Sequence, residues 1–161
     1  EIEQRDKAKA RIDEKIKDTV TVFRIYEFST SQSCEGHIGD KEKYEDSCPW
    51  IEIYAPEPEG WSKAKKKEKE QKEQEWTMAN LKQQKKMMDY FAEFYQGRET
   101  PVDAKFVFDR IGAFGGFRVQ SFGAEMIKLL PLNEQLKKLE LYRKEINSFT
   151  DFLKIKYFSK E

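Results

Sequence analysis

The apolar positions in the first quarter of the chain change their spacing and predict three segments. Glu1–Asp18 lacks Gly and Pro and carries a narrow apolar stripe, which predicts a helix. Residues 19–28 are rich in Val, Phe, Ile, Tyr and Thr, which suit a pleated surface, and predict a strand. The small polar residues of Ser29–His37 compete for backbone hydrogen bonds, so we expect a loop there. The helical stripe consists of Ala8, Ile12 and Ile16, spaced four residues apart.

Side-chain alternation predicts a second strand at Pro49–Tyr54, with the sequence PWIEIY. Its proline falls at the first strand position, where the missing N–H donor matters little. Residues 55–61 contain two Pro and one Gly, which interrupt any regular structure. We therefore expect the strand to end at a break in the chain.

Residues 62–75 (SKAKKKEKEQKEQE) predict the solvated, partly frayed start of a long helix. They are almost wholly Lys, Glu and Gln, which favour helix but offer no apolar face. A basic contact surface for phosphate stays open as an alternative, although the interspersed Glu residues cancel much of its field, and disorder of these residues is the third possibility. Apolar residues then recur at near-helical spacing, so we expect this half of the helix to pack on the core and to end near Gly97. These residues are Trp76, Leu81, Met88, Phe91 and Tyr95.

Two apolar runs around a glycine-rich bend predict a β-hairpin. The runs are residues 104–111 (AKFVFDRI) and 117–122 (FRVQSF), and the bend is 112–116 (GAFGG). The bend lacks the Lys-Ser/Thr of a P-loop and the glycine order of a dinucleotide-binding loop. One face of the second strand should be buried, with Phe117 and Val119 on one side and Arg118, Gln120 and Phe122 on the other.

The last segment, residues 133–158, carries a heptad-like apolar seam that is typical of a packed helix. Pro131 and Asn133 mark its start, and Asn133 is the expected N-cap. Two interpretations stay open, because one pattern serves both: the seam packs on this chain's own sheet and central helix, or it also contacts a protein partner or a second copy of the chain. The seam consists of Leu132, Leu139, Ile146 and Leu153 at intervals of seven, with Tyr142 and Phe149 offset by three.

This order of elements predicts one α+β domain over residues 1–161, with a small antiparallel or mixed sheet of about four strands covered by long helices. A chain of 161 residues is long enough to bury a core without disulfides or structural metal. The hydrophobic fraction of 38% barely exceeds the charged fraction of 37%, so we expect part of the helical content to be solvated.

The charge balance and the cysteine content limit the kinds of partner and the cellular compartment that we expect. Thirty Lys plus Arg balance thirty Asp plus Glu, so no overall field attracts nucleic acid or an anionic membrane, and only a local basic patch stays open. The apolar runs are far shorter than the roughly 18 residues of a membrane span. Two cysteines are few for a disulfide scaffold and favour a reducing, cytoplasmic location.

The stretch Ser29–Ile38 (STSQSCEGHI) is the strongest candidate for a functional site. It holds a thiol, the one histidine of the chain, an acid, a glycine and several hydroxyls, directly after a predicted strand. Loops at strand ends often carry sites, because the sheet holds them still. The candidate ligand-binding residues are Ser33, Cys34, Glu35, Gly36 and His37.

Metal binding is the first interpretation of this stretch. Cys34, His37 and Cys48 are zinc-type ligands. A structural zinc site usually has two closely spaced pairs of ligands, however, and this chain has only one such pair. The spacing Cys-x2-His-x10-Cys leaves only a carboxylate as the fourth ligand, and we assign no metal site from it. The carboxylates in question are Glu35, Asp40 and Asp46.

Three further interpretations stay open. In a catalytic interpretation, His37 acts as a general base, or Cys34 becomes a nucleophile if the turn brings His37 beside its thiol. In a structural interpretation, Gly36 supplies an unusual backbone angle and Cys34 packs as a small hydrophobe. A disulfide between Cys34 and Cys48 is the last alternative, which the expected compartment disfavours.

The same stretch resembles the Thr-Thr-Ser-Ser-Cys-Ser-Gly-Arg-Ile motif of the wybutosine-synthesising tRNA methyltransferase family. The matching positions are Ser33, Cys34, Gly36 and Ile38, and His37 stands where that family has arginine. The resemblance covers about ten of 161 residues, and in both cases a strand with a tryptophan, here Trp50, follows. It implies an S-adenosylmethionine-dependent enzyme that acts on tRNA.

Two functions of different class follow. The preferred one is a small non-enzymatic binding or assembly module with a pocket near the Ser33–His37 loop. The alternative is the tRNA-modifying enzyme that the resemblance implies, centred on Cys34 and His37. The residues by themselves assign neither a reaction nor a cofactor.

Overall fold

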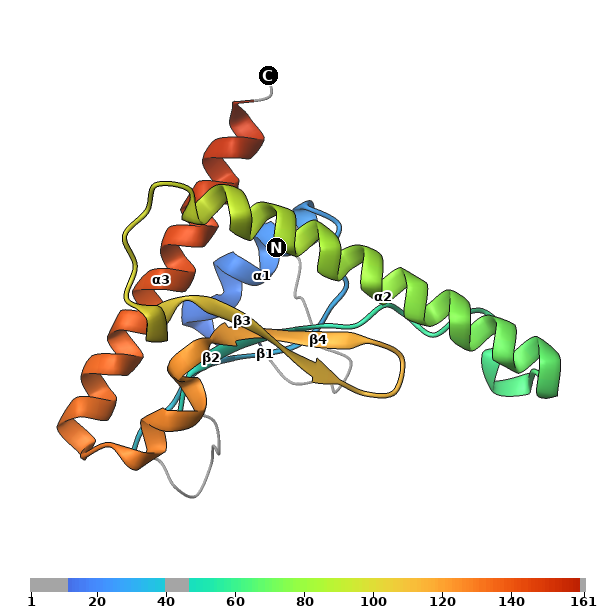
Figure 1. Ribbon diagram of the computed structural model, residues 1–161, viewed down its shortest axis with the longest axis horizontal. Helices are drawn as coiled ribbons and strands as arrows, with labels where there is room; N and C mark the ends of the chain where they lie inside the picture. Colours follow the sequence, from blue (N-terminus) through green and yellow to red (C-terminus); the bar gives the residue numbers. More distant parts are fainter. Residues whose placement is uncertain (1–11, 40–46, 160–161) are drawn as a thin grey trace.

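The computed structural model describes residues 12–39 and 47–159 and shows an α+β domain (Figure 1). Its helices α1, α2 and α3 lie on one face of a four-stranded antiparallel sheet, which confirms the predicted fold class. Labels with η mark 3₁₀ helices. The elements in chain order are η1 (Glu14–Ile16), α1 (Lys17–Ile25), β1 (Thr30–Glu35), β2 (Pro49–Ile53), η2 (Trp61–Lys63), α2 (Lys66–Tyr95), η3 (Val102–Ala104), β3 (Phe106–Ile111), β4 (Gly116–Ser121), η4 (Phe122–Leu129) and α3 (Leu132–Phe158).

The sheet has the strand order β1-β2-β4-β3, and every neighbouring pair is antiparallel. Ile51 lies opposite Val119 and Ile53 opposite Phe117, so these four side chains share the face below the helices. All four are buried there, as the alternation along the second hairpin strand predicts. We call this the inner face and the opposite one the outer face.

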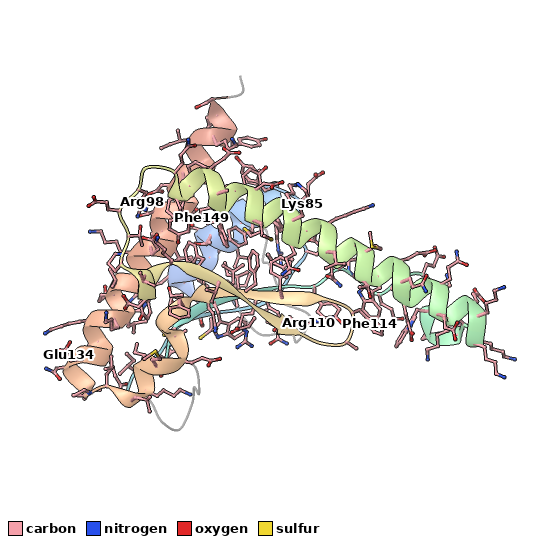
Figure 2. All side chains as sticks on the ribbon, viewed as in Figure 1. Lys85, Arg98, Arg110, Phe114, Glu134 and Phe149 are labelled. Carbon is pink, nitrogen blue, oxygen red and sulfur yellow. The ribbon has the colours of Figure 1, made fainter. Side chains whose placement is uncertain are left out.

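An aromatic core joins the inner face to the helices. Phe149 of α3 is fully buried, and its ring centroid lies 6.0 Å from that of Phe23, 5.0 Å from Phe91 and 5.7 Å from Phe106. Figure 2 shows Phe149 among the crowded side chains between α3, α2 and the sheet. Burial of each such ring stabilises the fold by about 1.5–3 kcal/mol, to which aromatic pairing adds.

The predicted apolar seam of α3 packs mostly within this chain. Leu139, Ile146 and Leu153 are buried, as are Tyr142 and Phe149, whereas Leu132 at the start of the seam is 59% exposed. The helix begins at Leu132, and Pro131 occupies the N-cap position with its carbonyl accepting bonds from the backbone of the first turn. The predicted N-cap Asn133 is therefore wrong, because Pro131 starts the helix two residues earlier.

The predicted strand at residues 19–28 is wrong, because Lys17–Ile25 forms helix α1. Ile16, Val20 and Phe23 are buried at helical spacing, so packing on the core overrides the strand preference of the β-branched residues. Of the helix predicted for Glu1–Asp18, the described part comprises η1 and the first residues of α1. Its upstream part, with Ala8, lies outside the described residues.

The loop predicted for Ser29–His37 is also wrong over most of its length, because Thr30–Glu35 forms the edge strand β1. Backbone pairing with β2 satisfies its donors and acceptors on one side. A register irregularity between Thr30 and Gln32 interrupts the ladder. Loop geometry begins only at Gly36, so the candidate residues fall on a strand end and the turn that follows it.

Helix α2 starts at Lys66 and ends at Tyr95, close to the predicted end, and its first turns are largely exposed. The predicted apolar stripe is confirmed at Phe91, which is buried, but is wrong at Leu81 and Met88, which are exposed, while Met87 and Phe94 are buried instead. The exposed half is attached to the hairpin by Asn80, whose amide donates to the Phe114 carbonyl at 2.9 Å, and by stacking of Trp76 on Phe114. Within residues 12–39 and 47–159, no helix combines the length and apolarity that crossing a bilayer requires.

Candidate functional site on the outer face of the sheet

The outer face of the sheet carries polar and reactive side chains in register. Cys34, Trp50 and Gln120 lie opposite one another on β1, β2 and β4. Glu52 and Arg118 belong to the next row, where an ion pair joins them at 3.7 Å. Because side chains alternate along each strand, these residues point away from the aromatic core.

At the β1 edge, the structure brings Asp13, Cys34 and His37 together. One potential ligand atom from each lies within 4.8 Å of the others. Asp13 Oδ2 accepts a hydrogen bond from the Glu35 backbone at 3.1 Å and lies 3.4 Å from His37 Nε2. The Cys34 side chain is buried, whereas Asp13 and His37 are half-buried and reach solvent. We call these three residues the Asp-Cys-His cluster.

A tight turn after β1 places His37 back beside Cys34. Gly36 has a φ of 78°, a left-handed conformation that favours glycine. A Cβ atom there would lie 2.7 Å from Leu139 Cδ1 and 2.8 Å from the Cys48 carbonyl carbon, so the turn is also closely packed. Arg143 of α3 donates to the carbonyls of Glu35 at 3.0 Å and Gly36 at 2.7 Å. The backbone and the guanidinium therefore fix the turn.

Of the five candidate residues, Cys34 and His37 join the cluster and Gly36 shapes it. Ser33 lies opposite Ile51 and faces the other side of the sheet, where its hydroxyl is buried without a partner among the described residues. Glu35 accepts a hydrogen bond from the Lys15 backbone at 2.9 Å, so it fastens η1 to β1. These two residues therefore lie beside the Asp-Cys-His cluster and are not part of it.

Cys48 belongs to a different environment. Its Sγ lies 3.7 Å from the Ala124 carbonyl, and its side chain packs in a second apolar cluster with Ile127, Leu139 and Tyr142. No disulfide joins Cys34 and Cys48. Of the other carboxylates that the sequence offered as ligands, Asp40 and Asp46 lie outside the described residues.

Sequence reasoning missed Asp13 as a site residue. It precedes Cys34 by 21 positions and lies within a segment expected to be helical, where an acidic residue reads as solvated surface. Its local signal was weak, because Asp before a helical turn is a common capping residue. In the structure Asp13 makes no side-chain cap hydrogen bond to η1, and its carboxylate turns to the Glu35 amide and His37 instead.

A pocket of ≈ 320 Å³ opens next to this cluster on the outer face. Trp50 and Arg118 line it, and the Arg118 Cζ lies 3.8 Å from the Trp50 ring centroid. Two buried donors, Trp50 Nε1 and Arg118 Nε, have no acceptor among the described residues. The remaining lining comes from β3, β4, η4 and the residues before β2: Ser47, Cys48, Asp109, Gln120, Ala124, Glu125 and Lys128.

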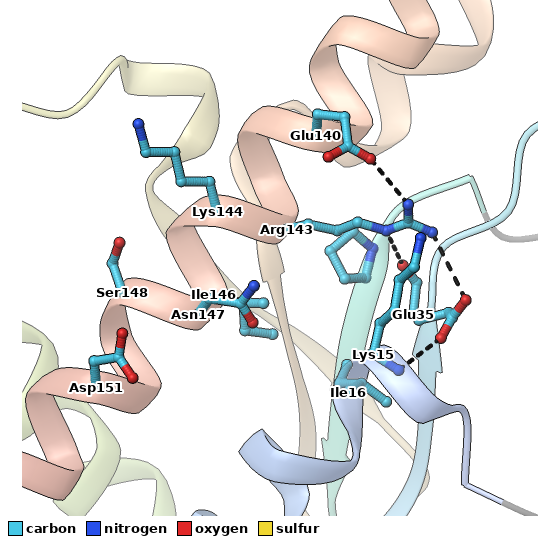
Figure 3. A pocket seen from close by; sticks show the side chains of 11 residues that line it. Lys15, Ile16, Glu35, Glu140, Arg143, Lys144, Ile146, Asn147, Ser148 and Asp151 are labelled. Atoms are coloured by element: carbon cyan, nitrogen blue, oxygen red, sulfur yellow. Dashed lines mark hydrogen bonds and ion pairs between the residues drawn. The ribbon is translucent and has the colours of Figure 1, made fainter.

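A larger pocket of ≈ 510 Å³ lies between η1, the end of β1 and α3 (Figure 3). Figure 3 shows the Arg143 guanidinium at one side of it, held by Glu140 at 3.1 Å and close to the Glu35 carboxylate. The Arg143 guanidinium already has carboxylate and carbonyl partners, so this cation offers a ligand little unpaired hydrogen-bonding capacity.

Comparison of the chain with protein-family models, with curated proteins and with solved structures finds no match. The function of the protein is therefore inferred from the side chains of the site.

Proposed function

We propose that this protein is a non-enzymatic binding domain that takes a small ligand with a carboxylate or phosphate group in the outer-face pocket. The carrying observation is the pair of buried donors, Trp50 Nε1 and Arg118 Nε, that have no acceptor among residues 12–39 and 47–159. An oxygen-rich group supplies the acceptors that both N–H groups need.

The energetic argument is that unpartnered buried donors are costly. Each one lowers stability by about 1–3 kcal/mol, because it gives up its hydrogen bond to water. Both donor atoms are closed off from solvent, so the side chains around them must move for a ligand to accept from both and recover that loss as binding free energy. The ≈ 320 Å³ of the pocket also falls within the range of about 300–1,000 Å³ that is usual for small-molecule sites.

The charges around the two donors support an anionic group. The Arg118 guanidinium lies over the Trp50 ring, and its ion pair with Glu52 at 3.7 Å is long, so its charge is only partly neutralised. Lys128 of η4 adds a second cation to the lining, which also contains the carboxylates of Asp109, engaged by the Gln120 side chain, and Glu125. An oxyanion would therefore have to bind on the side of the two cations and the two N–H donors.

Nuclear magnetic resonance of the three indole N–H groups tests the proposal directly. Inorganic phosphate, adenosine monophosphate and S-adenosylmethionine are titrated separately into ¹⁵N-labelled protein. We expect the Trp50 indole signal to shift saturably with at least one of them. Trp76 should not move, because its Nε1 donates to the Ala55 carbonyl at 2.7 Å. Trp61, whose buried Nε1 also has no described partner but which lies in η2 outside the pocket, is the matched control.

Two variants separate the donors from the charge. Arg118→Lys keeps a cation but removes the Nε–H donor, and Trp50→Phe removes the indole donor. Both should weaken the binding of whichever probe shifts Trp50 by about tenfold, the equivalent of one hydrogen bond of about 1.4 kcal/mol. A Trp50 signal that stays fixed with all three probes, or that moves together with Trp61, would refute the proposal.

A second candidate function is the S-adenosylmethionine-dependent modification of tRNA that the resemblance implies. The observation that favours it is the proximity of Cys34, His37 and Asp13, which unites a thiol, an imidazole and a carboxylate. The test is transfer of labelled methyl groups from S-adenosylmethionine to tRNA by the wild type, by Cys34→Ala and by His37→Ala. Transfer by the wild type that both variants lose would favour the enzyme over the binding domain.

We also propose a cytoplasmic location and self-assembly through α3. No disulfide joins Cys34 and Cys48, which supports a reducing compartment. Apart from Leu132, the seam residues of α3 are buried within the chain, so assembly would have to use exposed side chains of this helix, such as Leu132 and Leu136. Light scattering over a range of concentrations tests assembly, and a strict monomer contradicts it.

A further inference from the structure

We infer that Asp13, Cys34 and His37 form a binding site for a divalent transition metal ion, with zinc as the best fit. This inference is independent of the outer-face pocket and its ligand. One potential ligand atom from each residue lies within 4.8 Å of the other two. Zinc bonds of about 2.0–2.3 Å in a tetrahedron put neighbouring ligand atoms about 3.3–3.8 Å apart, so contraction by about 1 Å completes the geometry.

The chemistry of the three donors selects the metal class. A thiolate, an imidazole nitrogen and a carboxylate oxygen are the three ligand types that zinc takes in proteins. The thiolate disfavours magnesium and calcium, which prefer oxygen ligands only. Among the described residues the cluster supplies three ligands, and the fourth position of a tetrahedral site is then taken by water, by a bound molecule or by a ligand from the rest of the chain.

The surroundings of the cluster hold the ligands in place, as outer hydrogen bonds do at metal sites. The Gly36 N–H lies 3.4 Å from Cys34 Sγ and points a backbone donor at the sulfur. The Glu35 N–H fixes the Asp13 carboxylate. Arg143 holds the carbonyls of Glu35 and Gly36, so the Cys34-to-His37 turn does not have to be ordered when the metal binds.

Access and protonation are also suitable. The side chains of Asp13 and His37 are 26% and 19% exposed, so an ion reaches the cluster from the solvent side while Cys34 binds it from below. Binding breaks the S–H bond of Cys34, forms a sulfur–metal bond and releases the proton to solvent. Affinity should therefore rise with pH until the thiol is fully ionised.

Cobalt titration of the metal-free protein tests the inference, because Co²⁺ takes zinc sites and a cobalt–thiolate bond absorbs in the near ultraviolet. We expect a charge-transfer band that saturates at one equivalent and that Zn²⁺ abolishes by displacement. Cys34→Ser should lose the band entirely. Cys48→Ser should keep it, and this variant is a matched control because both cysteines are buried to a similar extent.

Two further variants examine the other ligands. Asp13→Asn keeps an oxygen acceptor for the Glu35 amide but removes the charge, and His37→Gln removes the imidazole. Each should weaken cobalt binding by at least about tenfold. Circular dichroism of each variant shows whether the fold is retained, so that weak binding is not mistaken for unfolding.

A measurement on the wild type keeps the inference testable if a variant does not fold. Alkylation by iodoacetamide is followed at each cysteine by peptide mass spectrometry, with and without Zn²⁺. Zinc should slow the modification of Cys34 by at least about tenfold and leave Cys48 unchanged. The inference is overturned if no cobalt–thiolate band forms, if the band follows Cys48 instead of Cys34, or if zinc protects neither cysteine. Any of these results leaves the Trp50 titration unaffected, so the two proposals fail separately.

Discussion

The two faces of the sheet carry different kinds of side chain. On the inner face, Ile51, Ile53, Phe117 and Val119 pack against three helices and contain no polar group that needs a partner. On the outer face, Glu52 and Arg118 alternate with them, and Trp50 is 7% exposed, yet its N–H has no acceptor in the described chain. The apolar side chains of the inner face need no partner, although the Ser33 and Ser121 hydroxyls beside them are buried without one among the described residues. The outer face differs in leaving two N–H donors, on Trp50 and Arg118, without a described acceptor.

This difference shows how one short sheet supports both stability and a site. Each buried apolar side chain of the inner face contributes about 1.5–3 kcal/mol. Two unpartnered donors on the outer face lower stability by about 1–3 kcal/mol each, so the inner face can offset them. Features that weaken a fold locally are common at binding sites. Substitutions on the two faces should therefore differ in kind, and the following predictions are ordered by expected size.

The largest effect is expected at the centre of the inner core. Phe149→Ala removes a fully buried ring that contacts rings from α1, α2 and β3, and should lower the free energy of unfolding by about 3–5 kcal/mol. Urea denaturation followed by circular dichroism measures the change. The control is Phe158→Ala on the same helix, where the ring is 67% exposed and the cost should stay below about 0.5 kcal/mol. Similar losses for both variants would disprove this account of the core.

The turn that supports the Asp-Cys-His cluster gives the next largest effect. Gly36→Ala forces a Cβ into contact with Leu139 and the Cys48–Pro49 backbone at a φ of 78°, and should cost about 2–4 kcal/mol. Gly39→Ala is the matched control, because Gly39 has a φ of 92° but no atom within 4 Å of the added Cβ. It should cost only about 1 kcal/mol of backbone strain. Equal unfolding midpoints in urea would show that close packing at Gly36 is unimportant.

The fold class, most of the element boundaries after residue 48 and the inner-face alternation of β4 could be predicted from sequence. Those elements either have a long apolar periodicity or are bounded by Gly or Pro, such as the glycine-rich bend before β4 and the Pro131 that precedes α3. Helix α1 could not be recognised by composition, since Thr19, Val20, Val22 and Phe23 are strand-type residues. Only the spacing of Ile16, Val20 and Phe23 agreed with a helix, and packing made that spacing decisive.

The candidate site was predicted only in part, for a physical reason. Cys34 and His37 are neighbours in sequence, and their proximity depends on a local turn around Gly36 that glycine itself signals. Asp13 and Arg143 reach the site from η1 and α3, so their roles depend on tertiary structure that no local pattern contains. The sequence places Ser33 and Glu35 in the site only on the expectation that residues 29–37 form a loop. On a strand, Ser33 must face the opposite side from Cys34.

A third prediction concerns a polar group that, unlike the outer-face donors, is fully paired. Burial opposes the ionisation of Asp103, but hydrogen bonds from Lys138 and from the Tyr142 hydroxyl at 2.9 Å outweigh it and hold the Asp103 pKa below its ordinary value. Since the pKa is lowered on folding, the charged carboxylate stabilises the protein above the unfolded pKa of about 3.9. This contribution is lost as pH falls through the folded pKa.

Asp103→Asn should therefore lower the free energy of unfolding by about 1 kcal/mol at pH 7. The gap between the variant and the wild type should stay constant down to about pH 5 and close below about pH 4. Urea denaturation at several pH values measures it. Asp151→Asn, at an exposed position of α3, serves as the control and should change little at any pH. A gap that persists in acid would mean that the Asp103 charge is not the source of the stabilisation.

The smallest change in stability is expected at the outer face, in a comparison of two tryptophans. Trp50→Phe loses some ring contact but also removes a buried N–H without a described acceptor, so the two effects should cancel to within about 0.5 kcal/mol. Trp76→Phe makes the same chemical change where Nε1 donates to the Ala55 carbonyl at 2.7 Å. It should cost about 1–3 kcal/mol, because it leaves that carbonyl without this donor. Urea denaturation of both variants decides the matter: if Trp50→Phe costs as much as Trp76→Phe, the Trp50 indole has a partner in the folded protein. The outer face would then have one unpartnered donor fewer, and the case for a ligand there would fall.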